Sequence, residues 1–364
     1  MVDDGSHAVP DLTVPLIGHD EALPAFVTAR SQGRLHHAWL ITGPKGIGKA
    51  GLAWRLAAAL QSGALPADSA GTDLFGEGAP TAGFVLDPGH PAVRLIAAGA
   101  HPGVLYLSRS VDAKTGRMKR DIGVDQVRRL GPFFGQTATD APWRIVIVDA
   151  ADELNPSSAN ALLKLLEEPP KRALLFLVSH VPGRLLPTIR SRCRTLAIRP
   201  IAGDRLTQWL IAESGHAVSA DDAALLARLS AGAPGRALML VREDGATLYR
   251  ALTGLLSAGS GIDTLMILSA GLAAPKEETR YRLFLTLLTD FLGRFVRFLA
   301  TGETDGLDAD DVALFQTMRQ RGGLDRWLEL WEKTNHLAER ADVVNLDRKQ
   351  LLIGLLSDFT GLAA

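Results

Sequence analysis

The stretch ITGPKGIGKAGLA, residues 41–53, limits the possible folds of this chain more than any other part of it. Gly43 is followed after four residues by Gly48 and Lys49, which is the spacing of a phosphate-binding P-loop. An apolar segment precedes the glycines and an Ala/Leu-rich segment follows them, so we expect a strand, a tight turn and a helix. Backbone N–H groups would converge on an anion at the start of that helix, where Lys49 adds a positive charge. The stretch therefore predicts a P-loop α/β fold.

The hydrolytic part of the motif is incomplete. A P-loop usually ends in Ser or Thr, whose hydroxyl helps to hold Mg²⁺, and here Ala50 stands in that place. The apolar segment RIVIVD ends in Asp149, which resembles a Walker B carboxylate, but Ala150 follows where active ATPases of the AAA+ class usually carry a catalytic Glu. We interpret Asp152 and Glu153 as capping or surface carboxylates. The two departures together argue against ATP hydrolysis by this chain.

Apolar segments alternate with helical patterns as far as Pro200. Several of these segments are apolar throughout, as expected for strands that are buried on both faces of a parallel sheet. The expected strands are 38–42, 104–108, 144–150, 173–179 and 194–198. Beyond Pro200 the patterns are helical. We therefore predict an α/β P-loop domain with a parallel sheet, followed by a small helical domain and an all-α C-terminal domain.

The three predicted domains have unequal lengths. They span 1–200, 201–246 and 247–364. Within the first, the Gly/Ala/Pro-rich segment at about 62–103 is expected to be an irregular insertion.

Composition narrows the possible functions. The formal net charge of −1 provides no global basic field for nucleic acid. The short basic run KTGRMKR, 114–120, is either a solvated hairpin turn, which we favour, or a contact with nucleic acid or a partner. Cys193 is the only cysteine, so we expect no internal disulfide and no cysteine-cluster zinc site. The polar, acidic start and the interrupted apolar region 251–275 predict a cytoplasmic protein without a membrane helix.

Arginines gather just before the last expected strand, in the segment LLPTIRSRCRTL. They are Arg184, Arg190, Arg192 and Arg194. Spacing alone favours ordinary solvated arginines. The other interpretation is an arginine finger that acts in trans on the nucleotide of a neighbouring subunit, a contribution of about 10³–10⁵ in rate. The residues by themselves leave both interpretations open.

Several motifs, in this order, resemble the bacterial clamp-loader family of AAA+ proteins. They are HHAWLITGPKGIGKA, NALLKLLEEPP and LLPTIRSRC, the last containing the SRC motif of that family. The segment GAPGRAL is similar to the sensor 2 motif and places Arg236 at that position, while Ser179 or His180 lies near sensor 1. The resemblance covers about residues 14–240, and the C-terminal third fits only in being helical and of suitable length.

The resemblance implies a subunit of the DNA polymerase III clamp loader, with a P-loop (AAA+) domain, a small helical lid domain and an all-α C-terminal collar domain that serves oligomerisation. The family members form a hetero-pentameric ring of motor (tau/gamma) subunits, a delta subunit and one further subunit, and the ring places a sliding clamp on primed DNA. Motor subunits keep a complete ATP site, whereas the further subunit keeps the SRC arginine beside a decayed site. This chain fits the second kind, so the resemblance implies that Arg192 is an arginine finger in trans.

The resemblance also implies a degenerate nucleotide site. Its residues would be Gly43, Lys45, Gly46, Gly48, Lys49, Asp149 and Arg236. We expect no required cofactor, and weak ATP or ADP binding stays open. Many relatives carry a zinc module of four cysteines after the P-loop helix, and the corresponding segment here has none, so we expect no zinc.

Two alternatives remain. The chain could be an active AAA+ motor subunit, which ATP turnover by the isolated chain, abolished by Lys49→Ala, would indicate. It could also be a scaffold unrelated to replication, which failure to associate with clamp-loader subunits would indicate.

Overall fold

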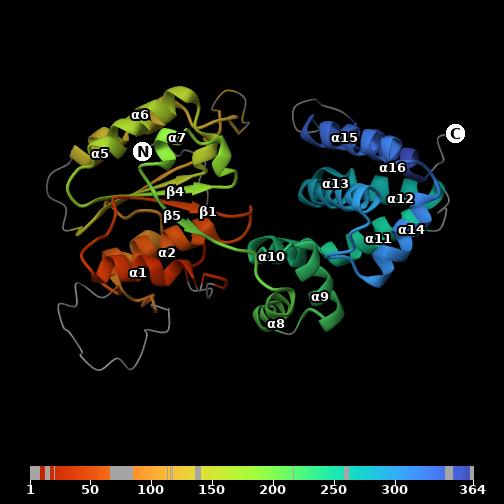
Figure 1. Cartoon of the computed structure of the whole chain (residues 1–364), viewed down its shortest axis with the longest axis horizontal. Coiled ribbons are helices and arrows are strands. Elements are labelled where there is room, and N and C mark those ends of the chain that lie inside the picture. The colour runs from red at the N-terminus through yellow and green to blue at the C-terminus, as the bar shows by residue number, and fades with distance from the viewer. Residues whose placement is uncertain are drawn as a thin grey trace. The chain divides into compact units, whose positions relative to one another are not determined.

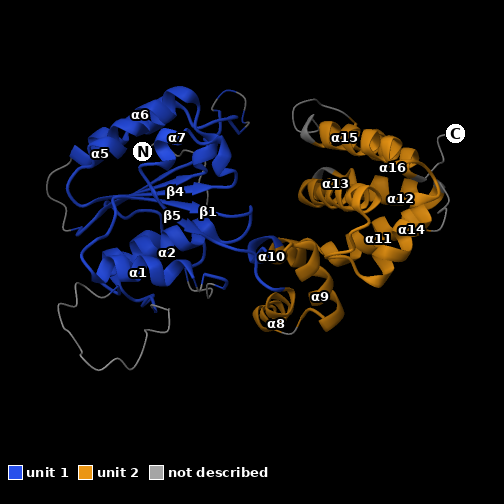
Figure 2. Ribbon diagram, in the orientation of Figure 1, with its two compact units in different colours: residues 1–202, 232–236 blue, residues 203–231, 237–364 orange. Residues whose placement is uncertain are grey.

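The structure is a computed structural model. It describes residues 9–12, 17–19, 21–65, 85–112, 114, 116, 118–135, 141–215, 217–257, 262–340 and 347–360. The chain divides into two compact units, and the second unit is helical where it is described. Figure 2 colours unit 1, residues 1–202 with 232–236, and unit 2, residues 203–231 with 237–364.

Unit 1 contains a five-stranded parallel sheet in the order β2-β3-β4-β1-β5. The strands are β1 Ala38–Thr42, β2 Val104–Leu107, β3 Arg144–Asp149, β4 Ala173–Ser179 and β5 Arg194–Ala197. The predicted parallel sheet is confirmed, and each predicted strand matches to within one residue. Residues of β4 are buried throughout, which explains why this strand reads as a continuous apolar run.

Helices cover both faces of this sheet (Figure 1). One face carries α1 Ala22–Ser31, α2 Lys49–Ser62 and α3 Pro91–Ala97. The other carries α4 Val124–Arg128, α5 Leu130–Gly135, α6 Pro156–Glu167 and α7 Pro187–Arg190. Alternate residues of a strand point to opposite faces, so each strand contributes to both cores.

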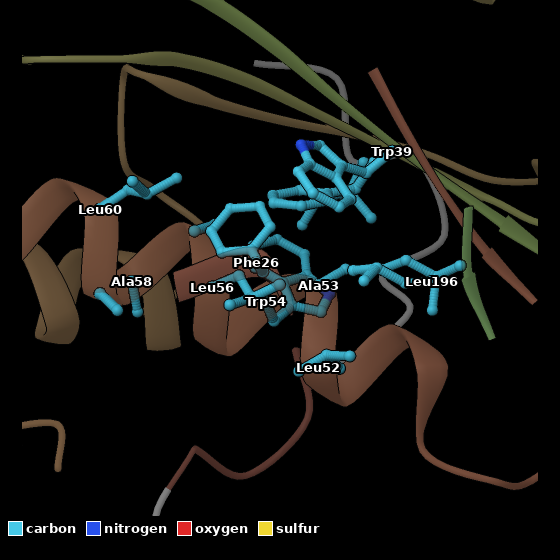
Figure 3. Packing of buried hydrophobic residues seen from close by; sticks show 14 of the residues in the cluster. Phe26, Trp39, Leu52, Ala53, Trp54, Leu56, Ala58, Leu60 and Leu196 are labelled. Atoms are coloured by element: carbon cyan, nitrogen blue, oxygen red, sulfur yellow. The ribbon is translucent and has the colours of Figure 1, made fainter. Parts of the chain in front are cut away.

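The core beneath α1 and α2 is built around aromatic side chains. Phe26 packs against Trp39, with ring centroids 5.0 Å apart, and also against Phe176. Figure 3 shows Phe26 and Trp39 beside the α2 side chains, which include Trp54. Burial of each large apolar side chain contributes about 1.5–3 kcal/mol, so this cluster fixes α2, and with it the P-loop, on the sheet.

The insertion differs from the expectation of an irregular segment because it contains α3. The His90 Nδ1 atom accepts a hydrogen bond from the Ala92 N–H at 3.2 Å and caps the helix, which begins with Pro91. Val93 and Ile96 are buried against the α2 side of the core. The helix is only seven residues long, too short for a clear amphipathic period in the sequence. Residues 66–84 lie outside the described part of the chain.

The basic run forms a hairpin turn. Val111 and Met118 pair as an antiparallel bridge, and the Gly116 N–H donates to the Asp112 carbonyl at 2.8 Å. Gly116 has a φ of +65°, which suits glycine in a turn. The predicted turn is confirmed, although Thr115 and Arg117 lie outside the described residues. Contact with a partner stays a prediction.

Unit 2 contains nine helices in the part that the structure describes, among them α10, which begins in unit 1. They are α8 Gly203–Glu213, α9 Ala220–Leu229, α10 Pro234–Arg242, α11 Gly245–Ser257, α12 Ile262–Leu272, α13 Glu278–Thr301, α14 Ala309–Arg319, α15 Leu324–Arg340 and α16 Arg348–Thr360. Phe291 and Phe295 of α13 pack against Phe315 of α14, and Phe295 also contacts Trp327 of α15. In the described residues, no helix is both long and apolar enough to cross a bilayer.

A buried carboxylate joins four helices of unit 2. Asp311 of α14 is 2% exposed and accepts a hydrogen bond from the Tyr249 hydroxyl of α11 at 2.5 Å. Arg228 of α9 and Arg294 of α13 form ion pairs with the same carboxylate. Burying a carboxylate is costly unless it is paired and hydrogen-bonded in this way. The network spans the boundary expected near residue 246, and separate lid and collar domains stay a prediction.

Candidate functional site

The P-loop turn, residues 43–48, joins β1 to α2 and requires glycine for steric reasons. Gly43, Gly46 and Gly48 have φ values of +148°, +80° and +96°, which L side chains rarely adopt. A Cβ at Gly43 would lie only 2.5 Å from the Ile198 carbonyl oxygen. The loop therefore wraps tightly against the end of β5, and α2 begins at its exit with Lys49.

Lys49 is turned toward its own loop. Its side chain is buried, and Nζ donates to the carbonyl oxygens of Gly43 and Pro44, both at 2.7 Å. Burial lowers the pKa of Lys49 to about 8, although the nearby carboxylates of Asp149 and Asp152 act in the opposite direction. The ammonium closes the turn through these two bonds.

Asp149 lies at the carboxyl end of β3, as predicted for a Walker B carboxylate. Its Oδ2 accepts a hydrogen bond from the Tyr106 hydroxyl of β2 at 3.0 Å. Burial, and then the charge of Asp149, raise the pKa of Tyr106, so the phenol stays protonated and remains a donor. Sequence reasoning missed Tyr106, and its only signal was its place in the strand expected at 104–108.

Two alanines and then two carboxylates, Asp152 and Glu153, follow Asp149. Ala150 is 2% exposed and fills the place of the usual catalytic Glu with a methyl group. Asp152 accepts a hydrogen bond from the His180 backbone N–H at 2.9 Å, and Glu153 pairs with Arg109 at 2.9 Å. Burial raises the pKa of Glu153. Both carboxylates are committed to local structure.

The expected sensor 1 residues lie beside the P-loop lysine. Ser179 ends β4, is fully buried, and its Oγ has no hydrogen-bond partner among the described residues. Burial and the adjacent positive charge of Lys49 lower the pKa of His180. An unsatisfied buried hydroxyl is costly unless a ligand or water bonds to it, so Ser179 fits a site for a polar ligand.

The expected sensor 2 segment also reaches the loop within unit 1. The Gly235 N–H donates to the Gly46 carbonyl at 2.8 Å, and a Cβ at Gly46 would lie 3.1 Å from the backbone nitrogen of Arg236. Lys45 is exposed on the same loop. The structure thus brings the predicted nucleotide-site residues together at the carboxyl edge of the sheet. His19, whose ring faces Gly48, was not foreseen.

Arg192 occupies a different environment. It follows α7 and is partly exposed, with 36% of its side chain accessible. One guanidinium nitrogen donates to the Thr188 carbonyl at 3.1 Å, and the other pairs with Glu167 of α6 at 2.9 Å. The next residue, Cys193, is half-buried, and burial raises the pKa of its thiol to about 12, so the thiol is protonated and unreactive.

Arg192 and the P-loop lie at opposite ends of two paired strands. Trp39 of β1 pairs with Arg194 of β5, and Thr42 pairs with Ala197. Arg192 precedes the amino end of β5, whereas the P-loop follows the carboxyl end of β1. Because a parallel strand rises about 3.3 Å per residue, the two lie on the order of 15 Å apart along the strands. The structure therefore does not bring Arg192 to the P-loop of its own chain.

A parallel sheet with a P-loop after β1, an aspartate at the end of β3 and a buried polar residue at the end of β4 defines a P-loop protein of the AAA+ class. Residues 81–202 match the family model described as DNA polymerase III, delta subunit. The chain is 32% identical over 334 residues to DNA polymerase III subunit delta prime of Pseudomonas aeruginosa, covering 90% of this chain and 92% of the relative. This chain belongs to the family of DNA polymerase III delta prime subunits.

Two further relatives show how far the likeness extends. Subunit delta prime of Escherichia coli is 36% identical over 206 residues, covering 55% of this chain and 58% of the relative. Subunit gamma/tau of Mycobacterium tuberculosis is 29% identical over 225 residues, which is 60% of this chain but only 34% of that relative. The likeness to the gamma/tau subunit is thus confined to a part of it.

Proposed function

We propose that this chain is the delta prime subunit of a DNA polymerase III clamp loader. In this role it joins motor (tau/gamma) and delta subunits in a ring that places the sliding clamp on primed DNA. Its own P-loop does not hydrolyse ATP. Its contribution to hydrolysis is Arg192, which reaches the nucleotide of a neighbouring motor subunit. Family membership supports the place in the complex, and the site geometry supports the division of roles.

The observation that carries this proposal is the position of Arg192 at the amino edge of the sheet. A side chain on the order of 15 Å from its own P-loop cannot touch a phosphate bound there. The guanidinium is partly exposed, and the described part of the chain engages two of its five N–H donors. It is therefore able to bond phosphate oxygens that another chain presents.

The residues around the P-loop support the part of the proposal that says this chain does not hydrolyse ATP. The two groups that normally serve Mg²⁺ and the attacking water are replaced by methyl groups, at Ala50 and Ala150. Asp149 is engaged by Tyr106. Nothing in this set polarises a water molecule, so hydrolysis would lack both its metal hydroxyl and its carboxylate.

Nucleotide binding without hydrolysis fits the same residues. Phosphate oxygens would be held by the loop N–H groups between Gly43 and Lys49 and by the Ser179 hydroxyl. Arg236, in the first turn of α10, lies beside Gly46. A bound nucleotide would supply the anion that the loop and the start of α2 favour. We propose weak ATP or ADP binding of this kind, with no zinc and no required cofactor.

The test is Arg192→Ala in a ring reconstituted from all its subunits. Single-turnover ATP hydrolysis should show one class of site slowed on the order of 10³-fold, because an arginine finger stabilises the charge of the transferring phosphoryl group. The other sites should keep their rates, and size-exclusion chromatography should show the ring intact. Arg190→Ala, an exposed arginine two residues earlier, is the matched control and should behave as wild type.

The isolated chain completes the test. We expect no ATP turnover from it, with or without Lys49. Turnover that Lys49→Ala abolishes would make the chain a motor subunit. Unchanged hydrolysis by every site of the Arg192→Ala ring would remove the proposed finger, and failure of the chain to enter the ring would remove its place in the complex.

A further inference from the structure

The side chain of Arg192 is paired with Glu167, the last residue of α6. We infer that Glu167 is a positioning residue: it fixes the plane of the Arg192 guanidinium in the orientation that the neighbouring subunit meets. The inference rests on the proposed function of Arg192. The ion pair links the LLEEPP segment, which contains Glu167, to the SRC segment, which contains Arg192.

The backbone at Glu167 is well anchored. Asn155 caps the start of α6, and its Oδ1 accepts a hydrogen bond from the Ser158 N–H at 2.9 Å. Pro169 and Pro170 follow the end of the helix. Leu166 is 2% exposed, and its carbonyl oxygen bonds the His37 Nε2 atom at 3.0 Å. These contacts fix the end of α6 against the start of β1. The carboxylate of Glu167 therefore projects from a rigid position.

The bonds of Arg192 leave part of its guanidinium free to act. Glu167 accepts at 2.9 Å from one terminal nitrogen, and the Thr188 carbonyl accepts at 3.1 Å from the other. The guanidinium is planar and rigid, so two bonds from two directions fix its plane. Among the described residues, three N–H donors have no partner and remain for the oxygens of a phosphate, which bidentate guanidinium bonding suits.

Helix stability does not account for a carboxylate at this place. A negative charge at the C-terminus of a helix opposes the helix dipole. The pair is also exposed, with 36% and 50% of the two side chains accessible, and exposed ion pairs contribute little to stability. What the pair does achieve is to restrict a long side chain that otherwise samples many rotamers, so that less entropy is lost when the phosphate is bonded.

The experiment uses the reconstituted ring with Glu167→Ala and Glu167→Gln. We expect Glu167→Ala to slow single-turnover hydrolysis at the adjoining site about tenfold, with the ATP concentration at half-maximal rate little changed. Glu167→Gln keeps an oxygen acceptor and should retain an intermediate rate. Glu168→Ala removes the next, exposed carboxylate and is the matched control that should behave as wild type.

A double-mutant cycle with Arg192→Ala gives the decisive readout. If Glu167 acts through Arg192, adding Glu167→Ala to the Arg192→Ala ring should change nothing further. A slowing that persists in that background, or wild-type rates in the Glu167→Ala ring, would overturn the inference while leaving the arginine finger intact. An Arg192→Ala ring with wild-type hydrolysis would instead overturn the proposed function itself. Faster hydrolysis after Glu167→Ala would mean that the carboxylate competes with phosphate, which also refutes a positioning role.

Discussion

The two edges of the central sheet use their charged groups in opposite ways. At the carboxyl edge, Lys49 bonds the carbonyls of its own loop and Asp149 accepts from Tyr106. At the amino edge, Arg192 is partly exposed and pairs with Glu167, which is also exposed. In the proposed function, the carboxyl edge can lack the groups for hydrolysis while the amino edge keeps its contact with a neighbouring subunit.

The glycines of the P-loop, at the carboxyl edge of the sheet, are needed for the fold. Gly43 lies against the Ile198 carbonyl, and Gly46 lies against the backbone at Arg236. Ala50, by contrast, stands where a P-loop usually carries a hydroxyl that helps to hold Mg²⁺. Packing therefore accounts for the glycines of the loop. This difference predicts how substitutions at each edge should behave.

The largest expected effect on stability is that of Gly43→Ala. The new Cβ would meet the Ile198 carbonyl oxygen at 2.5 Å, and φ of +148° is unfavourable for alanine. Strain and overpacking together should lower the free energy of unfolding by about 3 kcal/mol or more. The urea midpoint of the isolated subunit measures this loss.

Gly63→Ala is the matched control for that loss. Gly63 also has a positive φ, +73°, but a Cβ there would have no atom within 4 Å. It should cost only about 1 kcal/mol of conformational strain. Equal effects of the two substitutions would mean that the close packing of the loop is unimportant, and the argument for why the glycines persist would fail.

Much of the sheet could be predicted from the sequence, because strands buried on both faces are continuously apolar. The strand RIVIVD and the glycine spacing after AWLIT placed β3, β1 and the P-loop where the structure has them. Asn155 and Pro156 likewise signalled the start of α6, since a capping side chain and a proline at the first turn have a local cause. Strands and helix starts with local causes of this kind can be predicted without the tertiary structure.

The second prediction concerns the charge of Lys49. Burial lowers its pKa to about 8, so in the free subunit it loses its proton as the pH rises through that value. Phosphate favours the charged form, and ATP affinity should therefore fall about tenfold, or about 1.4 kcal/mol, between pH 7.5 and 9.5. Titration of the isolated subunit with ATP measures this.

Two variants isolate the lysine responsible. Lys49→Met should bind more weakly and show a flat profile over that range, whereas Lys45→Met, at the exposed lysine, should keep the slope. The lowered pKa of Lys49 also affects the free energy of unfolding. The unfolded chain keeps the Lys49 proton up to about pH 10.4, so the stability of the subunit should rise between pH 8 and that value. A flat wild-type binding profile would show that Lys49 does not reach the phosphate.

The contacts that sequence could not supply are those between distant segments. Tyr106 and Asp149 are 43 residues apart, and nothing near Tyr106 marks it as a partner for the carboxylate. Glu167 and Arg192 meet only because α6 and α7 lie on the same face of the sheet. Each segment reads correctly as a helix or strand by itself. The side chains that meet are set by tertiary packing, which a local pattern does not encode.

The smallest expected effect belongs to the amino edge. Arg192→Ala should change the free energy of unfolding of the isolated subunit by less than about 1 kcal/mol, because its ion pair with Glu167 is exposed and screened by solvent. Thermal melting beside Arg190→Ala measures the difference. A loss above about 2 kcal/mol would make Arg192 a structural residue. Lower stability of the subunit would then by itself explain slower hydrolysis by the Arg192→Ala ring. A near-zero loss, combined with slowed hydrolysis at the adjoining site, means that the residue is retained for a contact outside this chain.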